Sequence, residues 1–217
     1  MTPFSPRLLK GGLVLVDPAT SNVLRVIALQ YNPDTLTRTV QVQASGGESG
    51  DRSEALRLKG AGIETIKLEA EIDATDRLDD PGSNPTAVEL GIHPELAALE
   101  GLVHPRADAL QANEALASAG ALEVLPLEAP LTLFVWSKQR IVPVRVTDLS
   151  VTEEAFDVAL NPIRAKVTLG LRVLSVDDLG FRHRGGTLYM AYLRTKESLA
   201  GQSGSVPLST LGVEAIP

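Results

Sequence analysis

The sequence predicts an α+β, mainly β protein: a sheet domain with a helical insert and a further helix near its C-terminal end. Long segments alternate apolar and polar residues with a period of two, which is typical of half-buried strands. The middle of the chain, about residues 84–119, changes to helical spacing. A chain of 217 residues has room for one sizeable core and at most a small second unit.

The first third of the chain is predicted to form strands. Residues 13–16 are strand-sized, and residues 23–29 are apolar on both faces, which predicts a buried strand. A turn signal, Tyr31-Asn32-Pro33-Asp34, separates that strand from an alternating one that starts at Leu36, so the two are predicted to pair as an antiparallel hairpin. The glycine-rich residues 44–62 are expected to form an exposed loop.

A strand over residues 66–73 and three helices are expected next. One face of this strand is apolar and predicted to be buried: Ile66, Leu68, Ala70 and Ile72. Asn84-Pro85 predicts a helix start and Gly91 its end. His93-Pro94 opens a second helix, and residues 106–119 predict a third.

The last part of the chain returns to strands before a final helix. Residues 131–136 and 163–173 predict strands, and Pro143 between them suggests an edge strand or a bulge. Residues 181–186 are interpreted as a basic, flexible joint. The final helix is predicted to bury one face: Leu188, Ala191, Tyr192, Thr195 and Leu199. These patterns predict a sheet domain over residues 1–180 and a hinge, a final helix and a flexible tail over residues 181–217.

Composition excludes several classes of function. The chain contains no cysteine, which excludes disulfides, thiolate metal sites and a cysteine nucleophile. A net charge of −7 argues against a nucleic-acid-binding surface. No apolar run approaches the roughly 20 residues that cross a bilayer, and the N-terminus lacks a secretory signal pattern, so a cytoplasmic protein that does not insert into membranes is expected.

No catalytic or metal-binding motif is evident. His93 and His104 each precede a proline at a helix boundary, and His183 lies between two arginines, so none has metal-ligand spacing. Neither a G-x-S-x-G elbow nor a phosphate-binding loop is present. We therefore expect a non-enzymatic protein without a cofactor.

The order of motifs resembles the tube-like baseplate proteins of contractile injection systems, which are phage-tail-like particles. The resemblance covers roughly residues 10–200 and rests on the motifs Tyr31-Asn32-Pro33, Phe134-Val135-Trp136 and Pro162-Ile163-Arg164-Ala165-Lys166, together with the alternating strand over residues 66–73. It implies a tail-tube-like β-barrel or sandwich over residues 1–180 with a helical insert, followed by a C-terminal docking helix that carries Leu188, Tyr192 and Leu199. It also implies a structural role for these motifs in assembly.

The resemblance further implies a homo-oligomer, a six-fold ring that joins the inner tube to the spike or hub and contacts other baseplate proteins. Such a chain would be assembled in the bacterial cytoplasm into a phage-tail-like particle. Many members carry a lysin-motif domain after this part, but the 17 residues that follow residue 200 are too few for one. The tube initiator, the spike adaptor and the main inner-tube subunit stay open as roles.

Two other classes also stay open. A stand-alone ligand-binding β-barrel would need a pocket lined by inward-facing side chains. A hydrolase would need two carboxylates that converge about 5–9.5 Å apart in a cleft.

Overall fold

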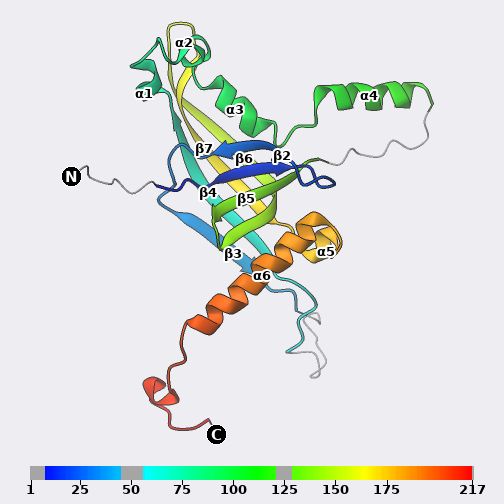
Figure 1. The fold of residues 1–217 in the computed structure, drawn as a ribbon, viewed down its shortest axis with the longest axis vertical. Helices are drawn as coiled ribbons and strands as arrows, with labels where there is room; N and C mark the ends of the chain where they lie inside the picture. Colours follow the sequence, from blue (N-terminus) through cyan, green and yellow to red (C-terminus); the bar gives the residue numbers. More distant parts are fainter. Residues whose placement is uncertain (1–7, 45–55, 121–128, 217) are drawn as a thin grey trace.

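A computed structural model of the chain describes residues 8–44, 56–120 and 129–216. Its centre is a curled seven-stranded sheet whose neighbouring strands are all antiparallel, in the order β2-β1-β5-β6-β7-β4-β3 (Figure 1). The strands are β1 (Gly12–Val16), β2 (Val23–Ala28), β3 (Leu36–Gln41), β4 (Ile63–Asp73), β5 (Leu131–Ser137), β6 (Arg140–Phe156) and β7 (Pro162–Val173). The α+β, mainly β class predicted from the sequence is confirmed.

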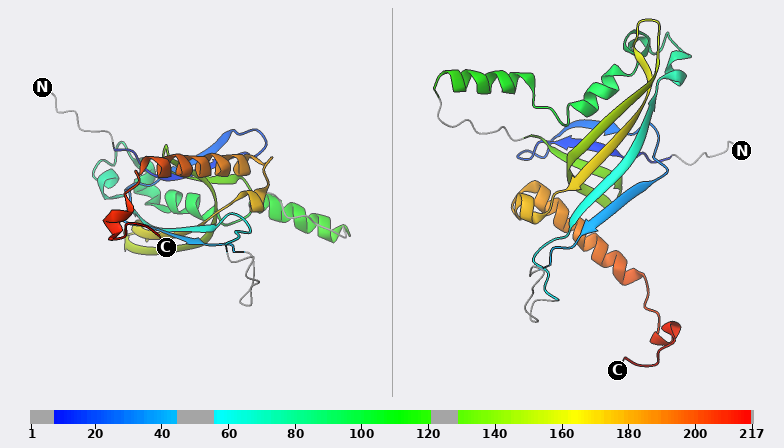
Figure 2. Two further views of the ribbon diagram at one scale, coloured as in Figure 1. Left: turned by 90° about the horizontal axis from the view of Figure 1, so that it is seen from below. Right: turned by 180° about the vertical axis from the view of Figure 1, so that it is seen from behind.

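Most helices lie near the two ends of the sheet, whereas the helix over residues 107–118 and the 3₁₀ helix over residues 208–211 lie away from it (Figures 1 and 2). The helices are α1 (Thr75–Leu78), α2 (Pro85–Leu90), α3 (His93–Glu100), α4 (Ala107–Ser118), α5 (Val176–Leu179), α6 (Arg184–Gln202) and the short 3₁₀ helix η1 (Leu208–Leu211). Helices α1 and α2 lie beside the tip of the β6–β7 hairpin, and α6 crosses the opposite end. The three helices expected in the middle of the chain are confirmed as α2, α3 and α4.

The core follows the predicted period of two. Alternate residues of β4 and β7 point into one apolar cluster, to which α3 and α6 also contribute. Its completely buried members are Ile66, Ala74, Ile92, Val142, Ala165, Val167 and Leu171. The interior of the curled sheet is therefore filled by side chains.

The predicted hairpin between residues 23–29 and the strand that starts at Leu36 is wrong. Strand β2 pairs with β1, and β3 pairs with β4, so the two lie at opposite ends of the strand order. Asn32 of this turn instead holds the segment just before β1. Its side chain accepts a hydrogen bond from the Gly11 amide (2.9 Å) and donates one to the Leu9 carbonyl (2.8 Å). The link from β2 to β3 thus spans the two edges of the sheet.

Strand β2 is also not buried, contrary to the prediction. Val23, Leu24 and Val26 are 61%, 54% and 63% exposed. The reason is topological: β2 is an edge strand with a partner on one side only. An apolar strand pattern cannot distinguish a strand buried within the chain from one left for another molecule to cover.

The two edges of the sheet approach each other at one seam. The Gln30 side chain, which follows β2, donates to the Asp73 carbonyl (2.7 Å) and accepts from the Asp73 amide (3.0 Å). The side-chain amide of Gln30 thus makes the two hydrogen bonds that a neighbouring strand would make at the end of β4. A cavity of about 370 Å³ lies along the seam, and residues of α3 form part of its wall. The curled sheet is therefore almost closed.

Pro143 is not on an edge strand. It lies in β6, between β5 and β7, and is fully buried. It is tolerated because the ladder with β7 begins one residue later, at Val144, and only the Pro143 carbonyl is used on that side, accepting from the Leu174 amide (2.9 Å).

Helix α6 starts earlier than predicted, and only part of its predicted face is covered: Tyr192 is buried, and Leu188 and Thr195 are half-buried. Gly185 and Gly186, expected within a flexible joint, form its buried first turn, followed by Tyr189 and Tyr192. By contrast, Ala191 and Leu199, two residues of the predicted buried face, are exposed. Of the predicted loop 44–62, residues 45–55 lie outside the described residues.

Candidate assembly surfaces

The motif Phe134-Val135-Trp136 forms the second half of β5 and serves the core. Phe134 is 1% exposed, and its ring stacks on that of Trp136 with centroids 5.8 Å apart. The Trp136 ring also covers Gly11 so closely that a Cβ on that glycine would lie 2.5 Å from the ring. The indole thus fixes the entry of the chain into β1, and a role for this motif in assembly stays a prediction.

The motif that begins at Pro162 ties β7 to its neighbours. Arg164 forms an ion pair with Asp73 on β4 (2.7 Å), and Lys166 forms one with Glu154 on β6 (3.1 Å). Ala165 between them is completely buried. The Pro162 carbonyl accepts from the Ile92 amide (2.9 Å), which docks the start of α3 on the sheet. These contacts are intramolecular, and the assembly role of the motif is likewise a prediction.

The docking helix α6 is held by a buried carboxylate that the sequence reasoning missed. Glu64 on β4 is 3% exposed. It accepts from Arg38 (2.7 Å), from Lys196 (2.7 Å) and from the Tyr192 hydroxyl (3.1 Å), so residues of β3 and α6 meet on one side chain. The Lys196 ammonium also lies over the Tyr192 ring, 4.1 Å from its centroid. Of the three residues predicted for docking, Tyr192 alone takes part in this network.

The surroundings of Glu64 make stability depend on pH. Burial by itself raises the pKa of Glu64, but the hydrogen bonds from Lys196 and Arg38 outweigh burial, and the pKa lies below its ordinary value of 4.5. A lowered pKa stabilises the fold above the unfolded-state value, and this contribution is lost as the pH falls through the folded-state value. Between about pH 5 and pH 3, the native chain is therefore expected to lose more unfolding free energy than a Glu64→Gln variant, measured by urea denaturation at each pH. Parallel curves for the two chains would contradict this assignment.

Apolar side chains are exposed on several surfaces of the described residues, and three of these surfaces are candidates for assembly. The first is the outer edge of β2. The second is α4, of which no described residue is buried; a 12-residue helix without packing is marginal in water. The third, which we call the C-terminal segment, is residues 203–216, all of them exposed. Its large apolar side chains include Val206, Leu211 and Ile216, which are 72%, 73% and 77% exposed.

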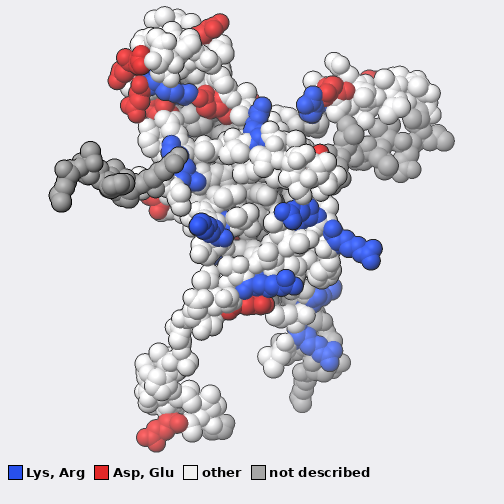
Figure 3. Space-filling model, in the orientation of Figure 1, with Lys and Arg blue, Asp and Glu red and all other residues white. Residues whose placement is uncertain are grey.

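Charge is unevenly distributed on the face shown in Figure 3. Asp and Glu gather over α1 and α2 at one end, whereas Lys and Arg are spread over the sheet and α6. The exposed acidic residues at that end are Asp76, Asp79, Asp80 and Glu89. The two ends of the molecule thus present different electrostatic surfaces.

Neither a metal centre nor a membrane span emerges from the described ranges. Within residues 8–44, 56–120 and 129–216, no three His, Asp or Glu side chains are grouped so that they could hold a metal ion. No helix in that same part of the chain has the length and apolar character needed to span a bilayer.

Comparison with known proteins gives a structural likeness only. No protein-family model and no curated protein matches the chain. Among solved structures, a chain from the tail of an empty GTA particle, obtained by helical refinement with C6 symmetry, is similar with 12% identity and a TM-score of 0.29, over 75% of this chain and 90% of that one. A chain from the virion of a native gene transfer agent particle gives 11% identity and a TM-score of 0.28, over the same shares.

Proposed function

We propose that this chain is a structural subunit of a contractile, phage-tail-like particle, and that it forms part of a six-fold baseplate ring between the inner tube and the spike. The observation that carries the proposal is the outer edge of β2. There, three apolar side chains are more than half exposed on a strand with an open hydrogen-bonding side. Soluble monomers avoid such edges, whereas ring subunits use them to join neighbours.

The remaining surfaces support the same role. Helix α4 lies away from the body (Figure 2) and gains packing only if another molecule covers it. The body itself is cross-braced by the Glu64 network and by the Gln30 bridge across the seam. A braced body with exposed attachment surfaces suits a subunit that must hold its shape while force passes through the ring.

A charge on the edge strand tests the proposal. A Val26→Asp variant is expected to remain folded, because Val26 is 63% exposed, but to lose ring formation, because a carboxylate would be desolvated at the contact. Circular dichroism would report the fold and sedimentation would report the assembly. Ser150→Asp, at an exposed position of β6 that is paired with β7, is the control and should assemble normally. Equal assembly of both variants would exclude the β2 edge as a contact.

The place in the particle is tested by counting copies. Quantitative mass spectrometry of purified particles should find this chain at the copy number of one ring, and electron microscopy should locate it near the spike. Hundreds of copies along the shaft would make it the main inner-tube subunit instead. If the chain is monomeric and is absent from particles, a stand-alone ligand-binding β-barrel is the remaining interpretation.

A further inference from the structure

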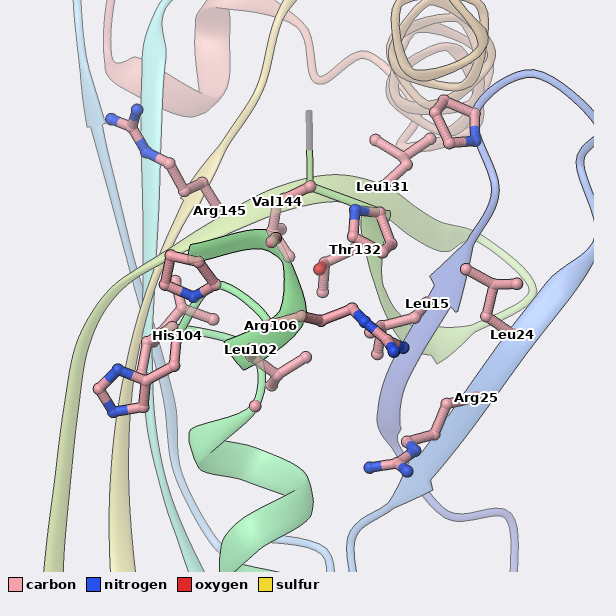
Figure 4. Close-up of a pocket in the computed structure, with 18 of the residues that line it drawn as sticks. Leu15, Leu24, Arg25, Leu102, His104, Arg106, Leu131, Thr132, Val144 and Arg145 are labelled. Atoms are coloured by element: carbon pink, nitrogen blue, oxygen red, sulfur yellow. The ribbon is translucent and has the colours of Figure 1, made fainter. Parts of the chain in front are cut away.

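A large open cavity lies at one end of the curled sheet, between β2, β5, β6 and the base of α4 (Figure 4). Its volume is about 1170 Å³, and its walls are mainly apolar, with Leu15, Leu24, Leu102 and Leu131 among them. Cavities of this size hold ligands of several hundred daltons or a short peptide segment. Ala109 and Ala112 of α4 complete one wall, so anything that fills the cavity also covers the helix that lacks packing.

The cavity carries positive charge. Arg25 and Arg106 extend into it from β2 and from the link between α3 and α4 (Figure 4). Arg106 is paired with Asp108 (2.8 Å), the one carboxylate among the described lining residues. Arg25 makes no ion pair or side-chain hydrogen bond with any described residue. An occupant with apolar side chains and a negative charge fits this lining.

The C-terminal segment has these properties. Its described residues include a single charged side chain, Glu214, which is acidic. Leu208 and Leu211 begin and end the 3₁₀ helix η1, and residues three apart in such a helix lie on the same side. Both leucines are exposed, at 40% and 73%. The segment thus presents an apolar pair next to one carboxylate, with no described contact that covers it.

The direction of α6 indicates which copy supplies the segment. Leu179, the last residue of α5, and His183, which caps the start of α6, line the cavity, whereas the C-terminal segment leaves from the far end of this 19-residue helix. The helix is about 28 Å long, and Figures 1 and 2 show the segment continuing away from the cavity. The chain's own segment would have to turn back along the whole helix, but the segment of a copy placed head to tail enters directly.

We propose that residues 203–216 of one subunit occupy the arginine-lined cavity of the next subunit, with Leu208 and Leu211 among its leucines and Glu214 near Arg25. This inference rests on the ring proposed above and assigns it a head-to-tail contact. Such a contact is heterologous, and it generates a closed ring when the rotation between neighbours closes.

Cross-linking between two full-length variants tests the contact, because the chain has no native cysteine. A Leu211→Cys chain is mixed with a Leu24→Cys chain in concentrated solution and oxidised. A seated segment raises the local thiol concentration, so the mixed disulfide should form at about tenfold the yield of a Leu211→Cys and Val42→Cys mixture. Val42 is a matched control because it is 65% exposed and lies outside the cavity lining.

Exchanging the charges at positions 25 and 214 tests whether these two side chains meet in the contact. Arg25→Glu in the Leu24→Cys chain should lower the yield, and Glu214→Arg in the Leu211→Cys chain should restore it. Equal yields from the cavity pair and the control pair would overturn the inference. So would a disulfide that forms within a single Leu24→Cys, Leu211→Cys chain at a dilution where the mixed pair gives none, because the segment would then occupy its own cavity.

A second measurement is independent of cysteine chemistry. Full-length Leu208→Asp, Leu211→Asp should self-associate about tenfold more weakly than the native chain in sedimentation experiments, with an unchanged circular dichroism spectrum. Unchanged association would overturn the inference. If the chain is found in particles but the cavity pair does not cross-link, the proposed function stands and the segment contact fails. If the cavity pair cross-links but purified particles lack the chain, the segment contact stands and the proposed function fails.

Discussion

Replacing Glu64 by alanine is expected to lower the free energy of unfolding by about 2–3 kcal/mol. The change leaves Arg38 and Lys196, whose side chains are 32% and 36% exposed, beside a cavity without a counter-charge. It also removes the acceptor of the buried Tyr192 hydroxyl. The partners keep some access to water, so the loss lies below that of a fully buried ion pair. Urea denaturation measures it.

The matched control is Glu69→Ala on the same strand. Glu69 is exposed on the opposite face of β4, and its loss should change stability by no more than about 0.5 kcal/mol. Equal effects at the two positions would show that the network around Glu64 contributes nothing specific. A variant that lowers the denaturation slope as well as the midpoint would instead indicate that α6 detaches before the sheet unfolds.

Replacing Gly186 by alanine is expected to destabilise the chain by about 2–3 kcal/mol. A Cβ at this position would lie 2.0 Å from the carbonyl oxygen of Gly180, a backbone atom that cannot rotate away as a side chain can. The first turn of α6 would have to move, and Tyr189 and Tyr192 would shift with it out of the core. Thermal and urea denaturation should both show the loss.

Gly201→Ala in the same helix is the control. A Cβ there meets nothing within 4 Å, and alanine forms helices better than glycine, so stability should stay equal or rise by up to about 1 kcal/mol. If Gly186→Ala were as stable as Gly201→Ala, the close approach of α6 to the Gly180 turn would not exist in solution.

The strands with one exposed face and one buried face were predictable from the sequence. The buried residues of β4 alternate strictly, and those of β7 alternate from Ala165 onward apart from Gly170, which is buried as well. For β2 the same reasoning failed, because apolar residues on both faces are equally typical of a central strand and of an edge that a partner covers. Pairing was also not predictable: the Asn-Pro turn signals a change of direction but does not specify which strand the chain joins next.

Glu64 left a signal that was not used. Glu64 alternates in phase with Ile66, Leu68 and Ala70, so the pattern places a single carboxylate on the buried face of β4. Such a group requires charged partners. Its partners could not be named, however, because Arg38 and Lys196 become neighbours only through the register of β3 and the docking of α6. The buried first turn of α6 was not predicted because Gly185 and Gly186 carry no apolar side chain that would show in a hydrophobic pattern.

The pairing of β1 with β5 has a consequence for biosynthesis. Gly12 is paired with Val135, so β1 has no central partner until residues 131–137 have left the ribosome. The apolar β1–β2 pair is exposed throughout that interval, and contacts so distant in sequence form slowly. The nascent protein is thus a natural client for chaperones, and slower translation would lengthen the time during which it can aggregate.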